Sequence, residues 1–180
     1  MITPTSIPDV VIYEPRVFFD ERGYFFESFN SATFAAETGI EINFIQDNQA
    51  RSVKNVLRGL HFQKAPYAQT KLVRVLHGVI WDIVVDIRKD SPSYGKWVGV
   101  ELSAENKKQL FIPKGFAHGY AVLSEAAEVF YKCDTPYHKE SESGIFFNDP
   151  ELNIDWKINL ADAILSDKDK LWQGLSDLQD

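Results

Sequence analysis

The sequence has little sulfur and little histidine. Among 180 residues there is one cysteine, Cys133, together with one methionine and four histidines. A single cysteine excludes a disulfide within the chain and is typical of proteins from a reducing compartment. Four histidines leave any metal site dependent on Asp or Glu to complete its set of ligands.

The chain also lacks a long apolar run and an excess of basic charge. No apolar segment approaches the roughly 20 residues of a membrane helix, and residues 1–5 do not begin a signal peptide. Lys and Arg number 19 against 26 Asp and Glu, so the net charge is -7. Nucleic acids and anionic membranes are poor partners for such a chain because both require a basic face. We expect a cytoplasmic protein that binds neither.

What the sequence contains is typical of one folded domain over residues 1–180. Hydrophobic residues make up 44% and aromatic residues 13%, and no linker, repeat or low-complexity tract divides the chain. Asn30 and Gly39 bracket one short helix over 31–38, and Ser166-Asp167-Lys168-Asp169 opens a last helical segment ending near 178. Many short strands with hardly any helix among them predict an all-β sandwich or barrel. The expected strands are 10–13, 43–50, 56–63, 71–76, 79–87, 97–102, 109–112, 120–123 and 128–133.

The stretch from Leu57 to Gln63, with Lys71 after the next loop, is the chemically distinctive part of the chain. Arg58, His61 and Lys71 place three basic groups on two adjoining strands of an acidic protein. A basic cluster in such a chain needs a local anionic partner, because long-range attraction works against the net charge. Strict alternation would put Arg58 and His61 on opposite faces of the strand. A β-bulge at Gly59 would bring them to one face, so we predict a bulge there.

Three residues suit acid–base chemistry, and each has a structural alternative. His61 carries an imidazole, a group suited to proton abstraction that needs a partner on its second nitrogen, for which Asp169 is the candidate; histidines in strands are more often structural. Asp169 also fits the first turn of a helix capped by Ser166. Tyr131 stays protonated at pH 7 and can act as an acid, although tyrosines in such strands are usually core residues.

The pattern Pro113-x-Gly115-x-x-His118 resembles the second motif of cupin jelly rolls, in which the histidine often binds a metal. A cupin metal site also requires a first motif with His-x-His and a glutamate. The matching region around His61 has one histidine only. The sequence therefore predicts a cupin-type barrel with no metal.

Over nearly its whole length the chain resembles the dTDP-4-dehydrorhamnose 3,5-epimerases of the cupin superfamily. The signatures occur in the order found in that family. They are Asp20-Glu21-Arg22-Gly23 with Phe26-Glu27, Gln46-Asp47-Asn48, Leu57-Arg58-Gly59-Leu60-His61-Phe62, Lys71, Asp86-Ile87-Arg88, Ile112-Pro113-x-Gly115-Phe116-Ala117-His118-Gly119, Tyr131-Lys132 and Leu165-Ser166-x-Lys168-Asp169.

The resemblance implies a cupin-type jelly-roll barrel with a few short peripheral helices, and a role for each matching residue. His61 is similar to the family's general base, Asp169 to its orienting carboxylate, Tyr131 to the acid on the opposite face of the sugar, and Lys71 to the group that stabilises the enolate. No cofactor and no metal are implied. The residues matching nucleotide- or sugar-binding positions are Arg22, Glu27, Gln46, Asp47, Asn48, Arg58, Lys71, His118, Glu142 and Lys168.

The family resemblance further implies a homodimer with exchanged N-terminal strands. Residues 1–30 would reach the partner subunit, so that Arg22 and Glu27 serve its site, and residues 150–180 would pack near the barrel mouth. The expected reaction is epimerisation at C3 and C5 of dTDP-4-dehydro-6-deoxy-D-glucose through an enolate. Three alternatives stay open: an epimerase of a single centre, a metal-dependent cupin enzyme, and a carbohydrate-binding jelly roll with no activity.

Overall fold

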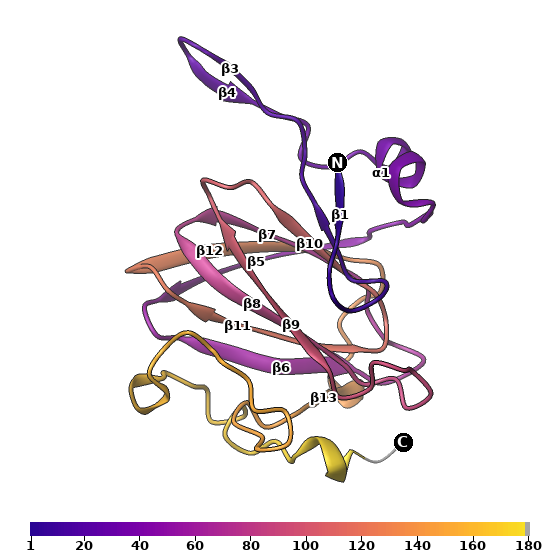
Figure 1. Cartoon of the computed structure of the whole chain (residues 1–180), viewed down its shortest axis with the longest axis vertical. Helices are drawn as coiled ribbons and strands as arrows, with labels where there is room; N and C mark the ends of the chain where they lie inside the picture. The colour runs from indigo at the N-terminus through magenta and orange to yellow at the C-terminus, as the bar shows by residue number, and fades with distance from the viewer. Residues whose placement is uncertain (179–180) are drawn as a thin grey trace.

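The computed structural model describes residues 1–178 and consists of two antiparallel sheets, a separate hairpin and little helix (Figure 1). The larger sheet has six strands in the order β1-β2-β10-β7-β12-β5, and the other has five in the order β13-β6-β11-β8-β9. The expected all-β, cupin-type jelly-roll barrel with a few short peripheral helices is confirmed. The strands are β1 (Ile2–Pro4), β2 (Val11–Tyr13), β3 (Phe18–Asp20), β4 (Gly23–Phe25), β5 (Gln46–Val53), β6 (Leu57–Gln63), β7 (Lys71–His77), β8 (Val79–Asp86), β9 (Trp97–Ser103), β10 (Gln109–Ile112), β11 (Phe116–Val122), β12 (Ala126–Cys133) and β13 (Glu142–Gly144).

Alternation of apolar residues along the strands gives each large sheet two buried faces. One cluster, including Val73, Val84 and Val129, fills the space between the sheets, and both sheets contribute to it. A second cluster, including Trp156, covers the outer face of the five-stranded sheet. A third cluster, including Phe34, covers the outer face of the six-stranded sheet. The barrel is therefore closed from outside on both sides, and its polar interior is reached at the strand ends and edges.

The short helix forms where the sequence predicts it. Helix α1 (Ser31–Thr38) begins after Asn30, whose side chain accepts hydrogen bonds from the amides of Ala32 and Thr33, and ends at Gly39 with φ 73°. The helix buries Phe34 against Tyr13 and Phe111. No helix within residues 1–178 is long and apolar enough to cross a membrane.

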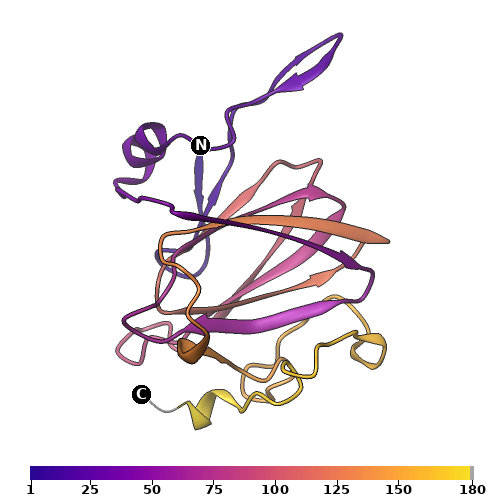
Figure 2. The ribbon, with the colours of Figure 1, turned by 180° about the vertical axis from the view of Figure 1, so that it is seen from behind.

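The C-terminal segment departs from the prediction. The helix expected from Ser166 to about residue 178 does not form; a turn at 167–170 is followed by the 3₁₀ helix η3 (Leu175–Asp177). The other short helices are η1 (Lys139–Ser141) and η2 (Leu160–Asp162). The segment lies beneath the five-stranded sheet (Figure 2), where Trp156 and Leu175 are buried. Its packing against the sheet outweighs the weak local helix signal. Residues 179 and 180 of the expected tail lie outside the described residues.

The hairpin β3–β4 projects away from the barrel (Figure 1). Its two strands pair only with each other, and it carries four exposed aromatic side chains. Their exposed fractions are 50% for Phe18, 76% for Phe19, 56% for Tyr24 and 70% for Phe25.

The bulge expected at Gly59 is present. His61 pairs with His118 and Arg58 pairs with Tyr120, so three steps along β6 match two steps along β11. As a consequence Leu57 and Leu60 both belong to the outer cluster. Arg58 and His61 therefore share the opposite, inner face.

Gly59 itself has φ 136°, and a Cβ there would lie 2.5 Å from the Cα of Gly119. We expect Gly59→Ala to lower the free energy of unfolding by about 3 kcal/mol or more, because strain at positive φ adds to a backbone clash. Urea unfolding followed by circular dichroism measures this. Gly39→Ala is the control, since its φ is also positive but nothing lies within 4 Å of the added Cβ. An equal loss in both variants would show that the close approach to Gly119 contributes nothing.

Candidate active site

His61 is held by a buried carboxylate. Its Nε2 lies 2.5 Å from Oδ1 of Asp169, and the Asp169 side chain is 3% exposed. The Asp169 amide donates to Oγ of Ser166, so the capping interaction and the contact with His61 coexist. Burial raises the pKa of Asp169, but the hydrogen bond and charge of His61 outweigh it and the net shift is downward. Within residues 1–178, Nδ1 of His61 makes no hydrogen bond, which leaves that nitrogen to accept a proton.

Tyr131 occupies the facing sheet. It belongs to β12 and packs against the cluster between the sheets, whereas His61 belongs to the inner face of β6. Imidazole and phenol thus enter one interior from opposite walls. Burial raises the pKa of Tyr131 to about 12, so the phenol keeps its proton at neutral pH. The arrangement can place a base and an acid on the two faces of a flat ligand.

A second imidazole–carboxylate pair lies inside the barrel. Nε2 of His118 is 2.9 and 3.0 Å from the carboxylate oxygens of Asp82, and the two side chains are 8% and 0% exposed. Burial raises the pKa of Asp82 and lowers those of His118 and Lys71. The charge of Asp82 acts against burial in the case of Lys71. The interior therefore holds a poorly hydrated ammonium whose field is weakly screened.

Polar residues gather along the edge strands β5 and β13 and the segments beside them, a region called the rim below. Glu142 accepts hydrogen bonds from Lys168 Nζ at 2.5 Å and from the Tyr137 hydroxyl at 3.0 Å. On β5, Gln46 donates to Asn48 at 3.0 Å. These are groups suited to a heterocyclic base or a sugar, which present both donors and acceptors.

Arg58 lies on the same rim. Its Nε donates to Oγ of Ser52 on β5 at 3.1 Å, which spans the gap between the two sheets. The rest of the guanidinium makes no hydrogen bond within residues 1–178. Its remaining N–H groups suit the oxygens of a phosphate.

Three expected binding residues lie elsewhere in the single chain. Asp47 pairs with Lys132 on the outer face of the six-stranded sheet, at 2.9 Å, so the structure does not bring it to the interior. Arg22 and Glu27 are exposed, in and just after the projecting hairpin, and bond to Asp20 and Asn30 respectively. Neither bond involves a residue of the barrel interior.

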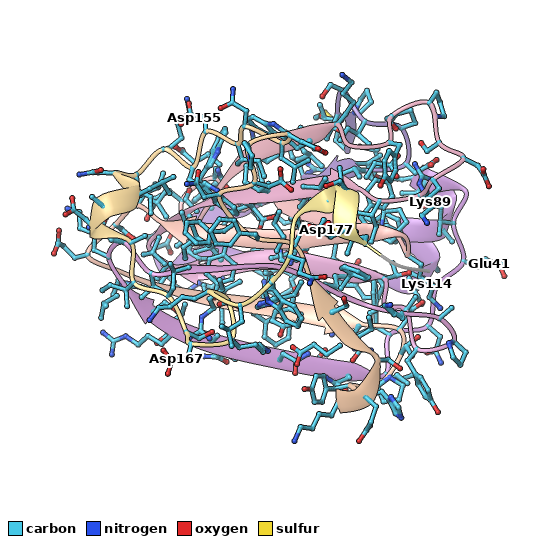
Figure 3. The ribbon with its side chains drawn as sticks, turned by 90° about the horizontal axis from the view of Figure 1, so that it is seen from below. Glu41, Lys89, Lys114, Asp155, Asp167 and Asp177 are labelled. Carbon is cyan, nitrogen blue, oxygen red and sulfur yellow. The ribbon has the colours of Figure 1, made fainter. Side chains whose placement is uncertain are left out.

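A cavity of about 760 Å³ lies at one end of the barrel and shares Lys71 and His118 with the interior. Phe62 and Tyr94 contribute apolar walls. Lys89, another lining residue, lies at this end of the molecule with Lys114, opposite Asp155 and Asp167 (Figure 3). Lys71 is only partly buried, and a ligand can reach its ammonium from this cavity.

Donor groups for a metal are not gathered together in residues 1–178: no cluster of three or more His, Cys, Asp and Glu side chains there could hold an ion. Each inner histidine has one carboxylate neighbour. Cys133 is buried, and burial raises its pKa to about 11, which disfavours the thiolate that metals bind.

Sequence reasoning missed four residues of the site. Asp82 lies in an apolar run, and an acidic residue in such a run could have indicated a buried functional group. Ser52 and Tyr137 could not be recognised in this way, because serines and tyrosines are common on strands and loops. Trp172, whose ring meets that of His61 edge-on at 6.4 Å, depends on the unpredicted path of the C-terminal segment.

Comparison with known proteins gives one consistent family. The family model described as dTDP-4-dehydrorhamnose 3,5-epimerase matches residues 4–177. A dTDP-4-dehydrorhamnose 3,5-epimerase of Escherichia coli is 58% identical, over 92% of this chain and 89% of that protein. The crystal structure of dTDP-6-deoxy-D-glucose-3,5-epimerase from Legionella pneumophila, in complex with dTDP-4-keto-L-rhamnose, is 49% identical with a TM-score of 0.95, covering 99% of this chain and 94% of that one. A 3'-monoepimerase from Streptomyces bikiniensis, in complex with dTDP-quinovose, is 31% identical with a TM-score of 0.90, covering 96% and 87%.

The lowered pKa of Asp169 predicts a pH-dependent contribution to stability. A depressed carboxylate pKa stabilises the fold above the ordinary value of 3.8, and that contribution is lost as the pH falls through the folded pKa. We expect Asp169→Asn to lower the free energy of unfolding by about 2 kcal/mol at pH 7 and the difference to shrink below pH 4. Urea unfolding between pH 7 and pH 3 measures it.

Asp167→Asn is the matched control, because Asp167 lies in the same turn with its side chain 99% exposed. We expect it to change stability by less than about 0.5 kcal/mol. A difference between Asp169→Asn and the unmodified protein that stays constant down to pH 3 would contradict the assignment.

Proposed function

This chain belongs to the dTDP-4-dehydrorhamnose 3,5-epimerase family, and from that membership we propose which of its residues carry the reaction. The protein is an isomerase that inverts C3 and C5 of dTDP-4-dehydro-6-deoxy-D-glucose and yields dTDP-4-dehydro-L-rhamnose. The ketone at C4 acidifies the protons on both neighbouring carbons, so each centre can be inverted through an enolate. The observation that carries the proposal is the pairing of a carboxylate-held imidazole with a partly buried phenol on the opposite wall.

His61 is the base and Tyr131 the acid. Asp169 accepts the Nε2 proton of His61 and fixes the tautomer, so that Nδ1 takes the proton from carbon. Tyr131 then gives its proton to the opposite face of the same carbon. A positioned base or acid contributes roughly 10²–10⁴-fold in rate. His61 then loses its proton to water and Tyr131 regains one from water, after which the same pair of steps inverts the second centre.

Lys71 stabilises the enolate oxygen. Burial lowers the pKa of this ammonium, which means that its charge is poorly hydrated and gains from an oxyanion. We infer that Lys71 takes the place that a metal ion has in other cupin enzymes. The substrate's own ketone supplies the activation, so the reaction needs no electron acceptor.

Residues of the rim bind the nucleotide. Arg58 presents a forked, permanent charge to the pyrophosphate, and Gln46, Asn48, Glu142 and Lys168 offer donors and acceptors to the deoxythymidine. A nucleotide sugar of this kind is made and used in the cytoplasm, which is where we place the protein.

A homodimer that exchanges the hairpin β3–β4 completes the site. Of the residues 1–30 expected to reach the partner, β1 and β2 pair instead with this chain's own six-stranded sheet, so the exchange is proposed for the hairpin alone. Four aromatic side chains exposed on one hairpin form an apolar surface that a monomer does not cover. A two-stranded hairpin is marginally stable alone, which favours its packing on a partner. In that arrangement Arg22 and Glu27 act in the partner's site.

Solvent deuterium tests the reaction. Incubated in heavy water with dTDP-4-dehydro-6-deoxyglucose, the protein should introduce deuterium at C3 and C5, as seen by NMR. His61→Asn should abolish exchange, because no base remains. Tyr131→Phe should keep exchange but lose inversion, with turnover reduced roughly 10²–10⁴-fold. Both variants should bind dTDP as the unmodified protein does.

His77→Asn is the control, since His77 is an exposed residue at the end of β7. Deuterium at C3 alone would instead identify a single-centre epimerase. Stoichiometric iron or manganese in the purified protein would favour a metal-dependent cupin enzyme. Binding without any exchange would leave only a carbohydrate-binding jelly roll.

The dimer has its own test. Light scattering should give about twice the 20.5 kDa mass of the chain. Phe19→Asp with Phe25→Asp should yield monomers that bind dTDP roughly tenfold or more weakly, because burying two carboxylates in the interface is unfavourable. Arg22→Ala is the matched variant: it should stay dimeric and still bind dTDP more weakly. A double variant that remains dimeric would refute the exchange of this hairpin.

A further inference from the structure

Trp172 differs from the other three tryptophans of the chain. Trp81, Trp97 and Trp156 belong to the cluster on the outer face of the five-stranded sheet, and their indoles donate to backbone carbonyls at 3.0, 2.9 and 2.8 Å respectively. Within residues 1–178, Trp172 joins none of the three apolar clusters, and its buried Nε1 makes no hydrogen bond. A buried indole usually finds a partner for its N–H group. The role that the other three have, which is to fasten the C-terminal segment to the sheet, therefore does not account for Trp172.

The indole of Trp172 lies beside the imidazole of His61. The two ring centroids are 6.4 Å apart and the ring planes are inclined by 68°, which is an edge-to-face arrangement. Gly144 pairs with His61 across β13 and β6, and a Cβ on Gly144 would lie 2.6 Å from Cε2 and 2.7 Å from Cδ2 of the indole. The indole thus occupies the space that a side chain at position 144 would take, next to the imidazole.

Trp172 and Asp169 reach His61 from the same C-terminal segment. Oδ1 of Asp169 lies 2.5 Å from Nε2 of His61, and the indole follows three residues later. The carbonyl of Gln173 accepts a hydrogen bond from the Phe146 amide at 2.8 Å, which fixes the backbone next to Trp172. The His61 side chain is still 26% exposed. Complete burial therefore does not hold the imidazole, and the carboxylate and the indole are the groups that restrain it.

We propose that Trp172 is a positioning residue that holds the His61 ring in the orientation in which Nε2 donates to Asp169 and Nδ1 is left to act as the base. An imidazole that is hydrogen-bonded through one nitrogen can still turn about that bond, or flip and exchange its two nitrogens. The indole beside the ring obstructs both motions and limits the access of water to the hydrogen bond. Trp172 acts through the contact of its ring and transfers no proton. This role rests on the proposed function, in which His61 is the base.

The tautomer of His61 tests this role. Nitrogen-15 NMR of the labelled protein above neutral pH distinguishes the ring nitrogen that carries hydrogen from the one that does not, and the His61 signals are those missing from His61→Asn. The unmodified protein should show hydrogen on Nε2 and none on Nδ1. In Trp172→Ala the two shifts should approach each other, because both tautomers become populated. Trp172→Phe keeps an aromatic ring and loses no hydrogen bond, so it should retain the shifts of the unmodified protein.

Turnover should follow the tautomer. We expect Trp172→Ala to lower kcat and the rate of deuterium exchange together by about 10-fold, within the roughly 10²-fold that misplacement of a reacting group can cost. The KM and the affinity for dTDP should stay unchanged, because the rim that binds the nucleotide is not altered. Trp172→Phe should restore most of both rates.

Two further variants separate this role from a structural one. Trp81→Ala is the matched control, because it removes an indole of the outer cluster together with its hydrogen bond to the Asp155 carbonyl in the C-terminal segment. It should lower stability in urea and leave the His61 signals unchanged. Trp172→Leu keeps an apolar side chain but not the flat ring, and it should shift the His61 signals as Trp172→Ala does. It serves as the test if Trp172→Ala does not fold.

The proposal is overturned if the His61 signals of Trp172→Ala, or of Trp172→Leu in its place, match those of the unmodified protein. It is also overturned if Trp172→Phe loses as much turnover as Trp172→Ala, or if Trp81→Ala shifts the same signals. If the unmodified protein itself incorporates no deuterium, the proposed function fails, and this role fails with it. If the unmodified protein is active and Trp172→Ala is as active, only the role of Trp172 is lost.

Discussion

The contact between the backbones of Gly59 and Gly119 is the constraint on which the interior depends. A Cβ on either glycine would meet the other strand at 3.0 Å or less, so β6 and β11 can approach only where both side chains are absent. The bulge at this point turns Arg58 and His61 to one face. It also turns Leu57 and Leu60 together toward the C-terminal segment. One local irregularity thus directs a cation and a base inward and gives the outer cluster its contacts.

Burial is what makes the interior chemically useful in an acidic protein. The chain carries a net charge of -7, and in water that charge would oppose any anionic ligand. Inside the barrel the local charges dominate instead, because they are weakly screened there. Lys71 is destabilised as a cation by burial and so gains from an anionic ligand, whereas Tyr131 is destabilised as an anion and so holds its proton at neutral pH. Desolvation thus lowers the pKa of Lys71 and raises that of Tyr131, because it disfavours the charged form of each.

The sequence predicted those parts of the fold and site that local rules decide. Asn30 and Gly39 bracket α1 because capping is a local interaction. The bulge was predictable because Arg58 and His61 can share one face of the strand only if a residue is inserted between them, and Gly59 permits this. The helix after Ser166 failed because packing of the C-terminal segment overrides a short capping signal. Asp47 was chosen with its neighbours, yet alternation turns it outward to Lys132. Ser52 could not be found at all, since its hydrogen bond with Arg58 exists only when two sheets face each other.

Side chains of the site that make no hydrogen bonds of their own must be held in position by contacts outside the site. Within residues 1–178 the Lys71 ammonium, the Tyr131 hydroxyl and Nδ1 of His61 make no hydrogen bonds, so these polar groups contribute little to stability. The restraint comes from saturated networks nearby. Asp86 is fully buried and accepts from Arg88, Ser91 and Ser93, and Asp149 accepts from the amides of Glu151 and Leu175. Both carboxylates fix loops that follow the strands bearing the site. The hydrogen-bonded carboxylates stabilise the fold, whereas the side chains of the site keep donors and acceptors free for a ligand. Because the two sets of residues are separate, the interior can be rigid before a ligand enters it.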